Sequence, residues 1–190
     1  MALLVSLVPP GGTVVDVGCD HGHVAHALRA VGVERAPRRL PARPGRYLVA
    51  NGLAPFRAVD TAVIAGMGPA TLLGIVDRGP QPRVLVAHCP DGMDRVRQGL
   101  ADRGWRIDAE GLAREGDRIS EVLRAVPGRE PHTGHRLRFG PLLECDPLVE
   151  ELAAHHLARW RQVAERAPAA TEAHQRAVRW IKWFEAGRPA

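Results

Sequence analysis

The stretch that most constrains the fold is Thr13–Leu28, which reads T-V-V-D-V-G-C-D-H-G-H-V-A-H-A-L. Its first part, Val14–Val17, is rich in β-branched residues, as expected of a central strand in a parallel sheet. Gly18 and Gly22 then allow a tight turn, and the residues that follow predict a helix. A strand, a glycine-rich turn and a helix in this order predict an α/β fold with a ligand-binding corner at the end of the first strand.

An acidic residue within this turn restricts the kind of ligand. Asp20 stands where the dinucleotide-binding pattern G-x-G-x-x-G has its middle glycine. Its carboxylate would repel a pyrophosphate, so a cationic or amine-bearing ligand fits better. S-adenosylmethionine has a sulfonium and an α-amino group and no phosphate, and Asp16 at the end of the strand also suits it. The alternative is that Asp20 only caps the following helix.

Composition indicates an ordinary folded protein. The 190 residues suffice for one well-buried domain with an appendage, and 45% hydrophobic with 25% charged residues argues against disorder. The net charge of +5 and the pI near 10.0 suit a polyanionic partner such as RNA. An arginine-rich chain with a single lysine also fits the codon bias of a GC-rich genome, so both interpretations stay open.

The cysteines and the first residues bear on location. Cys19, Cys89 and Cys145 form no C-x-x-C pair, so we expect neither a disulfide framework nor a zinc knuckle. The opening M-A-L-L-V-S-L-V-P-P has no basic region and is too short to span a bilayer, which predicts a short helix in a cytoplasmic protein. Metal binding is a weaker alternative, resting on one group of side chains: Cys19, His21, His23 and His26.

Strands and helices alternate along most of the chain. The predicted elements are a helix over 21–31, strands at Val31–Glu34, Tyr47–Ala50 and Val59–Ile64, a helix at Pro69–Val76, a strand at Arg83–Ala87 and a helix at Met93–Arg103. Residues 105–112 and 119–126 then alternate as two strands of a hairpin. Parallel βα units with a terminal antiparallel hairpin are the order of a Rossmann-like class I methyltransferase sheet.

Two further strand ends supply candidate ligand contacts. Glu34 closes the second strand, where a carboxylate accepts hydrogen bonds from ribose hydroxyls, although it also reads as a surface charge paired with Arg35. Asn51 follows the third strand and is a candidate contact to an adenine edge. The run Ala65-Gly66-Met67-Gly68 after the fourth strand predicts a second backbone turn beside the first, unless its glycines serve packing alone.

The last part of the chain is predicted to be separate. We expect a cofactor-binding domain over 1–128, a linker over 129–147 and a helical hairpin over 148–190, because two apolar stripes at helical spacing flank Pro168. The hairpin is expected to be an antiparallel coiled coil. Its other face mixes arginines with glutamates, which fits either a solvated surface or a surface that binds RNA.

Four short motifs follow one another along the chain: D-V-G-C-D-H at 16–21, N-G-L at 51–53, I-A-G-M-G at 64–68 and F-G-P-L-L at 139–143. In this order they resemble the motifs of the bacterial tRNA (adenine(22)-N1)-methyltransferase family. Residues 16–21, D-V-G-C-D-H, resemble the family's D-I-G-S-D-H, and residues 64–68, I-A-G-M-G, resemble its I-A-G-M-G-G. Residues 51–53, N-G-L, are similar to its G-D-G-L, and residues 139–143, F-G-P-L-L, to its F-G-P-x-L ahead of a coiled coil. This chain differs at Asn51 and Pro69, at residues 88–91 and in a shorter segment between its second and third strands.

The resemblance implies transfer of a methyl group from S-adenosylmethionine to N1 of a tRNA adenine, by a monomer without metal or membrane. The alternatives are a catalytically impaired RNA-binding relative and a methyltransferase that acts on a small molecule or a protein. The residues expected to present the target base are Asp20, Gly66, Met67 and Gly68. Those expected to bind the cofactor are Asp16, Gly18, Cys19, Asp20, His21, Glu34, Asn51, Gly52, Leu53, Ala65 and Gly66.

Overall fold

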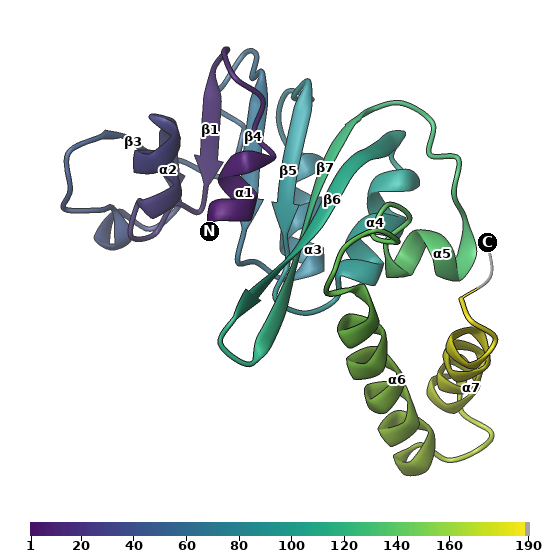
Figure 1. Cartoon of the computed structure of the whole chain (residues 1–190). Helices are drawn as coiled ribbons and strands as arrows, with labels where there is room; N and C mark the ends of the chain where they lie inside the picture. The colour runs from purple at the N-terminus through teal and green to yellow at the C-terminus, as the bar shows by residue number, and fades with distance from the viewer. Residues whose placement is uncertain (189–190) are drawn as a thin grey trace.

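The computed structural model describes residues 1–188, so the last two residues of the expected 148–190 hairpin lie outside the described part. A seven-stranded sheet of order β3-β2-β1-β4-β5-β7-β6 forms the body of the protein (Figure 1). The pairs among β1 to β5 are parallel, whereas β7 is antiparallel to both β5 and β6. The strands are β1 (Val14–Val17), β2 (Val31–Glu34), β3 (Arg46–Val49), β4 (Thr61–Ala65), β5 (Val84–His88), β6 (Trp105–Glu115) and β7 (Arg118–Pro127).

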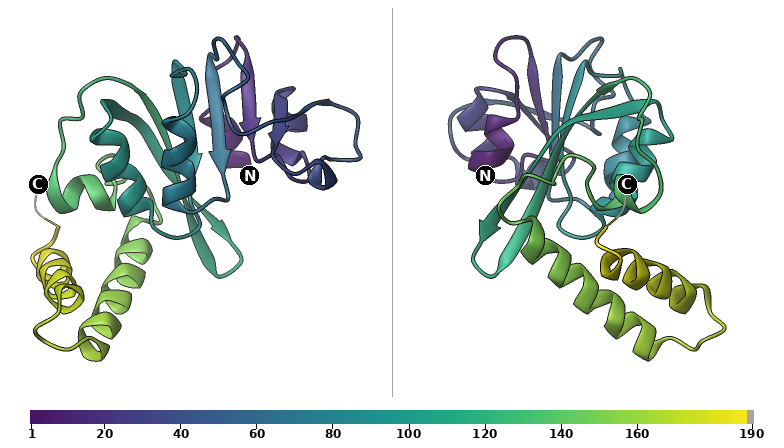
Figure 2. Two further views of the ribbon diagram at one scale, coloured as in Figure 1. Left: turned by 180° about the vertical axis from the view of Figure 1, so that it is seen from behind. Right: turned by 45° about the vertical axis from the view of Figure 1, so that its right-hand side comes forward.

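Helices cover both faces of this sheet (Figure 2). Alternation along β4 sends Ile64 to one face, with Leu72 of α3 and Val96 of α4, while Val63 faces Leu4 of α1 on the other. The two faces therefore hold two apolar layers, and the predicted α/β methyltransferase sheet is confirmed. The helices of the body are α1 (Ala2–Ser6), α2 (His23–Leu28), α3 (Pro69–Val76) and α4 (Met93–Ala101).

The helix after the first turn is shorter than predicted. The sequence predicts a helix over 21–31, but α2 begins after Gly22 and ends at Arg29, whose φ of 51° is left-handed. The N-cap of α2 is Gly22, and no side chain caps it. The alternative that Asp20 only caps this helix is therefore wrong.

The crossover from β2 to β3 is the most reduced part of the sheet. It contains one short 3-10 helix, η1 (Pro37–Arg39), because the proline-rich segment leaves no room for an α-helix. The strand order makes β3 an edge strand, and without a helix in this crossover Leu48 is 38% and Val49 46% exposed. The expected short crossover is present, and it leaves this side of the sheet thinly covered.

The segment expected as a linker contains a helix of its own. Residues 134–139 form α5 (Gly134–Phe139), and Leu137, Phe139 and Leu143 are buried. Leu137 joins the core of the sheet, whereas Phe139 joins the core of the C-terminal helices. The segment therefore packs as part of both bodies.

The C-terminal helices α6 (Val149–Arg166) and α7 (Glu172–Glu185) run antiparallel below the sheet (Figure 1). The Trp160 and Trp180 rings stack with centroids 5.7 Å apart. His174 bonds the Ala164 carbonyl near the loop at 3.0 Å. Aromatic side chains thus hold the two helices together along their length. None of the helices in residues 1–188 has the length and apolarity needed to cross a membrane.

Candidate functional site

A cavity of about 430 Å³ opens at the carboxyl ends of β1, β2 and β4. The chain reverses its strand order between β1 and β4, and ligands of open α/β sheets bind at that position. The volume falls within the range of small-molecule sites. The predicted residues that line it are Gly18, Asp20, Glu34, Asn51, Gly52, Ala65, Gly66 and Met67.

The two glycine turns meet across this cavity. Gly18 has φ +75° and Gly66 has φ +76°, a region that side chains with a Cβ rarely adopt. A Cβ on Gly18 would lie 2.1 Å from Met67 Cε, so the methionine side chain lies directly over the first turn. A Cβ on Gly66 would meet nothing within 4 Å and would enter open space. The site thus exposes bare backbone on two sides.

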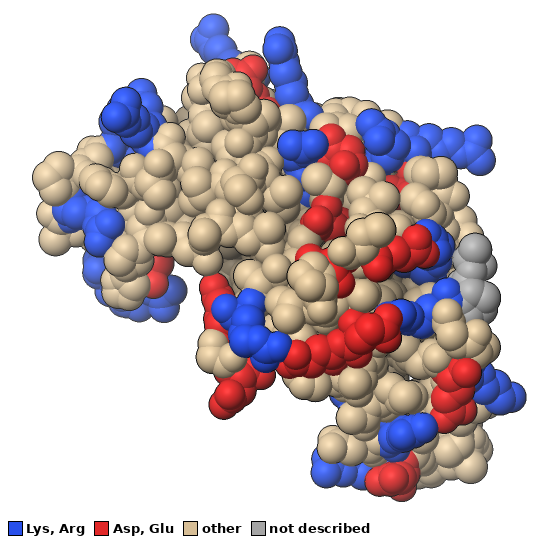
Figure 3. Space-filling model, viewed as in Figure 1, with Lys and Arg blue, Asp and Glu red and all other residues tan. Residues whose placement is uncertain are grey.

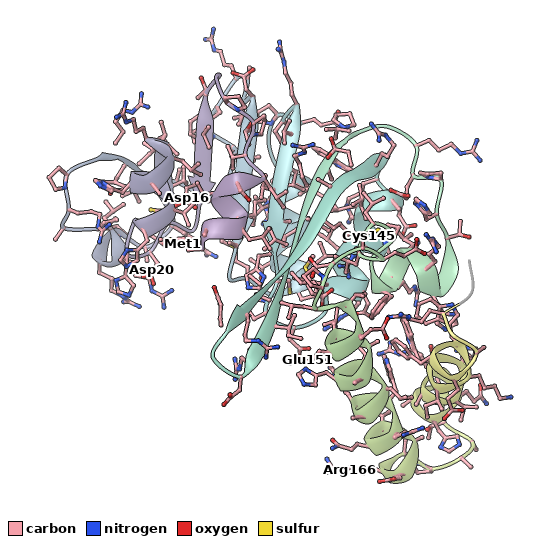
Figure 4. The ribbon with its side chains drawn as sticks, in the orientation of Figure 1. Met1, Asp16, Asp20, Cys145, Glu151 and Arg166 are labelled. Atoms are coloured by element: carbon pink, nitrogen blue, oxygen red, sulfur yellow. The ribbon has the colours of Figure 1, made fainter. Side chains whose placement is uncertain are left out.

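Asp16 lies behind the first turn, outside the set of lining residues. Its carboxylate is 4% exposed, and Oδ2 accepts a hydrogen bond from the Ala25 amide at 2.9 Å. Burial raises the pKa of Asp16 from 3.8 to about 6, although the hydrogen bond from Ala25 acts in the opposite direction. Asp16 therefore ties β1 to the start of α2 and holds the turn in shape (Figure 4).

Asp20 stands at the rim of the cavity. Its φ of 40° is left-handed, and its side chain is 58% exposed, with Oδ2 3.4 Å from His21 Nε2. In Figure 4, Asp20 lies below β1 and α2, at the surface of the molecule. A carboxylate so placed suits the amino group or sulfonium of a bound ligand.

Glu34 is a buried carboxylate at the end of β2. It is 8% exposed and lines the cavity, and Oε1 accepts a hydrogen bond from the Ala36 amide at 3.0 Å. The interpretation of Glu34 as a surface charge is therefore wrong. The other carboxylate oxygen, Oε2, forms no hydrogen bond within the described residues and can accept from ribose hydroxyls.

Besides Asp16, four of the predicted site residues do not line the cavity. Leu53 is 1% exposed in the sheet core, and Gly68 is the N-cap of α3. Cys19 is buried under Gly32, where burial and nearby carboxylates raise the pKa of its thiol to about 11. His21 has a 79% exposed side chain. These five residues therefore lie outside the lining of the cavity.

Three arginines also line the cavity, although none of them was predicted to bind the ligand. Arg35 and Arg39 come from the proline-rich connector after β2, and Arg78 comes from beyond the end of α3. The connector is rich in arginine, and this composition is the signal that the sequence offers for Arg35 and Arg39. Arg78 gave no sequence signal, because only the packing of α3 beside β4 brings it to this edge.

A second cavity, of about 420 Å³, lies at the end of β5. The loop after β5, the tip of the β6–β7 hairpin and α6 line it. Gly66 N donates to the His88 carbonyl at 3.1 Å, so the two loops that border the cavities touch. Glu121 lies in this second cavity; burial alone would raise the pKa of its carboxyl, but Arg97 and His156 lower it to about 2.

The site does not resemble a metal centre. Within residues 1–188, no group of three or more His, Cys, Asp or Glu side chains is placed to hold a metal ion. The residues do fit S-adenosylmethionine. Two bare glycine turns, an available carboxylate at the end of β2 and an acid at the rim match its parts, and the cavity is large enough.

The strand order with an inserted antiparallel β7, together with this cavity, defines a Rossmann-like methyltransferase. Residues 46–182 match the family model described as tRNA (adenine(22)-N(1))-methyltransferase. The chain therefore belongs to the tRNA (adenine(22)-N(1))-methyltransferase family, as the motifs predict. The match begins after the first glycine turn, so the turn itself is supported by its geometry. No curated protein sequence matches the chain significantly.

Solved structures of similar proteins span almost the whole chain. A Streptococcus pneumoniae protein proposed to be a tRNA (m1A22) methyltransferase, in complex with S-adenosyl-L-methionine, has TM-score 0.76 and 25% identity over 99% of this chain and 97% of its own. M. capricolum TrmK with S-adenosyl-homocysteine has TM-score 0.82 and 12% identity over 98% and 95%. The B. subtilis m1A22 tRNA methyltransferase TrmK has TM-score 0.73 and 17% identity over 99% and 97%.

Proposed function

We propose that this protein transfers the methyl group of S-adenosylmethionine to N1 of an adenine in tRNA, at position 22. The observation that carries this proposal is the family match of residues 46–182 together with a ligand cavity at the strand-order reversal. The S. pneumoniae relative, crystallised with S-adenosyl-L-methionine, supports the choice of cofactor. A tRNA substrate agrees with the expected cytoplasmic location. We expect the protein to act as a monomer.

The residues of the first cavity have distinct roles in this proposal. S-adenosylmethionine supplies an electrophilic methyl carbon on its sulfonium. Glu34 accepts hydrogen bonds from the ribose hydroxyls, and Asn51 contacts the adenine edge. Asp20 attracts the methionine amino group, while the backbone at Gly18 and Gly66 allows close approach.

The acceptor base needs orientation more than proton transfer. N1 of adenine has a lone pair, so no general base is required, and an in-line displacement depends on positioning. The target nucleotide must leave its stack to reach the site. We place it between the Gly66–Gly68 turn and the second cavity, which opens at the end of the neighbouring strand β5.

One observation favours a second candidate, a catalytically impaired RNA-binding relative. The crossover between β2 and β3 contains only η1, and it forms the outer wall of the cofactor cavity through Arg35 and Arg39. A wall of this kind gives fewer fixed contacts to the nucleoside than a packed helix would. Cofactor affinity decides between the two candidates.

The test combines titration calorimetry with methyl transfer. We expect the wild-type protein to bind S-adenosylmethionine with micromolar affinity and to form 1-methyladenosine in an unmodified tRNA transcript, measured by nucleoside mass spectrometry. A transcript with guanine at position 22 should yield none. Asp20→Ala should weaken cofactor binding, whereas the matched control Asp117→Ala, at the exposed β6–β7 turn, should not.

Each other outcome has a defined meaning. A folded wild-type protein that binds tRNA but not S-adenosylmethionine would favour the impaired relative. Cofactor binding without any affinity for tRNA, at any salt concentration, would favour a methyltransferase that acts on a small molecule or a protein.

A further inference from the structure

A large cleft lies outside the two cavities described above, between α4, α5 and α7. Its volume is about 610 Å³, larger than the cofactor cavity. Seen from behind, the three helices follow one another along one side of the molecule (Figure 2, left). Four arginines line the cleft, one from α4, one from α5 and two from α7: Arg95, Arg138, Arg176 and Arg179.

Among the described residues, none of these four guanidinium groups forms an ion pair. Three carboxylates line the same cleft, Asp94, Asp102 and Glu172, but none lies within 4.0 Å of these arginines, so the cleft keeps an excess of one positive charge. Elsewhere, buried or surface arginines close to acids do form such pairs, as Arg103 does with Asp77 at 2.7 Å. The cleft arginines therefore remain available for an external anion.

The surrounding side chains hold part of this positive surface in place. The Arg176 guanidinium lies over the Trp160 ring, 5.0 Å from its centroid. Arg138 Nε donates to Gln98 Oε1 at 3.2 Å. Burial lowers the pKa of His135, and the charges of Arg138 and Arg179 act in the same direction, so both guanidinium groups lie near this ring.

Arg95 connects the cleft to the methyl-transfer edge of the sheet. A Cβ on Gly92 would lie 2.7 Å from an Arg95 guanidinium nitrogen and 2.8 Å from Pro69 Cγ. The Arg95 side chain therefore lies beside the start of α3, directly after the Gly66–Gly68 turn. The phosphates of a nucleic-acid strand that extends from the Gly66–Gly68 turn would contact Arg95 first and then Arg176 and Arg179 of α7.

The opposite face of the molecule is less suited to a polyanion. On the face shown in Figure 3, acidic side chains gather where the sheet meets the C-terminal helices. The arginines of that region are engaged with acids, as Arg114 is with Glu151 and Arg136 with Glu144. Phosphate groups would have to displace these pairs.

We propose that the cleft between α4, α5 and α7 binds the phosphodiester backbone of the tRNA on its path away from the target adenine. This inference rests on the proposed function and assigns part of the substrate-binding surface. Guanidinium groups bind phosphates with charge-assisted, often bidentate hydrogen bonds. The four arginines come from three helices, and the cleft volume exceeds what one small anion requires, so it fits an extended strand.

The test measures binding of an unmodified tRNA transcript to the full chain as a function of salt concentration. Arg176→Gln/Arg179→Gln should weaken binding roughly ten-fold at 0.15 M salt and reduce the slope of log K against log salt by about 1.5. Arg95→Gln, whose side chain stacks on no aromatic ring, should act in the same direction with about half the slope change. The matched control is Arg83→Gln/Arg106→Gln, two exposed arginines that do not line the cleft, one just before the start of β5 and one in β6.

A charge change of the opposite sign separates phosphate binding from a structural role. Glu172→Gln removes one cleft carboxylate and should tighten tRNA binding about two- to three-fold, an effect that a merely structural role would not produce. Calorimetry with S-adenosylmethionine should give wild-type affinity for every variant.

Three results would overturn the proposal. The first is that folded Arg95→Gln and Arg176→Gln/Arg179→Gln variants bind tRNA with the affinity and the salt dependence of the wild type, while the wild type methylates tRNA. That result would leave the proposed function standing. The second is a wild-type protein that neither binds nor methylates tRNA, which removes the proposed function as well. Equal weakening by the control variant would also refute a specific cleft.

Discussion

Arg97 is a buried arginine whose guanidinium is paired with two carboxylates, Glu110 and Glu121. It is 1% exposed, and its Nε donates to Glu110 Oε1 at 2.7 Å. One terminal nitrogen lies 2.8 Å from Glu121 Oε2 and donates to the Arg138 carbonyl at 3.1 Å. These contacts join α4 to β6, β7 and α5, and Glu121 continues to His156 of α6 at 3.7 Å. One guanidinium thus links the sheet to the C-terminal helices.

We predict that Arg97→Met lowers the free energy of unfolding by about 4 kcal/mol at pH 7, measured by urea denaturation. Removing one partner of a buried ion pair typically costs about 3–5 kcal/mol, since a charge is left without compensation. Here two carboxylates lose their partner, with side-chain exposures of 0% for Glu110 and 12% for Glu121. The matched control Arg103→Met removes an exposed pair with Asp77 and should cost a small fraction of that loss.

The pH dependence gives this prediction a second, independent readout. In the wild type the pKa of Glu121 is lowered to about 2. This carboxylate therefore contributes fully to the free energy of unfolding above pH 4.5, and its contribution is lost as the pH falls toward 2. Without Arg97, burial raises this pKa above its ordinary value, so the variant gains stability as the pH falls. The loss should therefore be smaller at pH 5 than at pH 7. A loss below about 1.5 kcal/mol, or one that is equal at both pH values, would refute the reasoning.

Three further predictions concern the residues in and behind the cofactor cavity. Burial raises the pKa of Asp16 to about 6, so the free energy of unfolding of the wild type should fall by up to about 3 kcal/mol as the pH rises from 4 to 7. In urea titrations Asp16→Asn should remove this pH dependence, and an unchanged pH dependence would contradict the prediction. Glu34→Gln should raise KM for S-adenosylmethionine about ten-fold in the methylation assay with a smaller change in kcat. Gly18→Ala should weaken cofactor binding at least about ten-fold by calorimetry, because the added Cβ lies 2.1 Å from the Met67 methyl and the positive φ strains the backbone. Adding Met67→Ala should restore part of the affinity, since it removes the contact but leaves the backbone strain.

Local sequence determined the order of elements and the corner of the site. The β-branched strand ending at Asp16 and the glycines after it specify a strand and a turn, because positive φ values are a property of single residues. Alternation in residues 105–126 likewise identified the terminal hairpin, although β6 and β7 are longer than predicted. The parallel sheet was predicted from these patterns, whereas the family was predicted from the resemblance of four motifs.

Tertiary packing decided which residues face the site and which do not. Leu53 belongs to a family-like motif but is buried in the core, and Glu34 is buried where the sequence also allowed a surface charge. The helix α5 escaped prediction because six residues with few apolar contacts of their own are marginal as an isolated helix. Its stability comes from Leu137 and Phe139, which pack into two different cores.

The arginine cleft shows the limit of sequence reasoning most clearly. Arg95 and Arg179 are 84 positions apart in the numbering, and each alone is an ordinary surface charge. The sequence determined that the C-terminal helices carry arginines, since composition and helical spacing are local. Only the docking of α7 against α4 and α5 brings these arginines together, because that docking depends on the burial of Trp180 and Phe139 among residues distant in the chain.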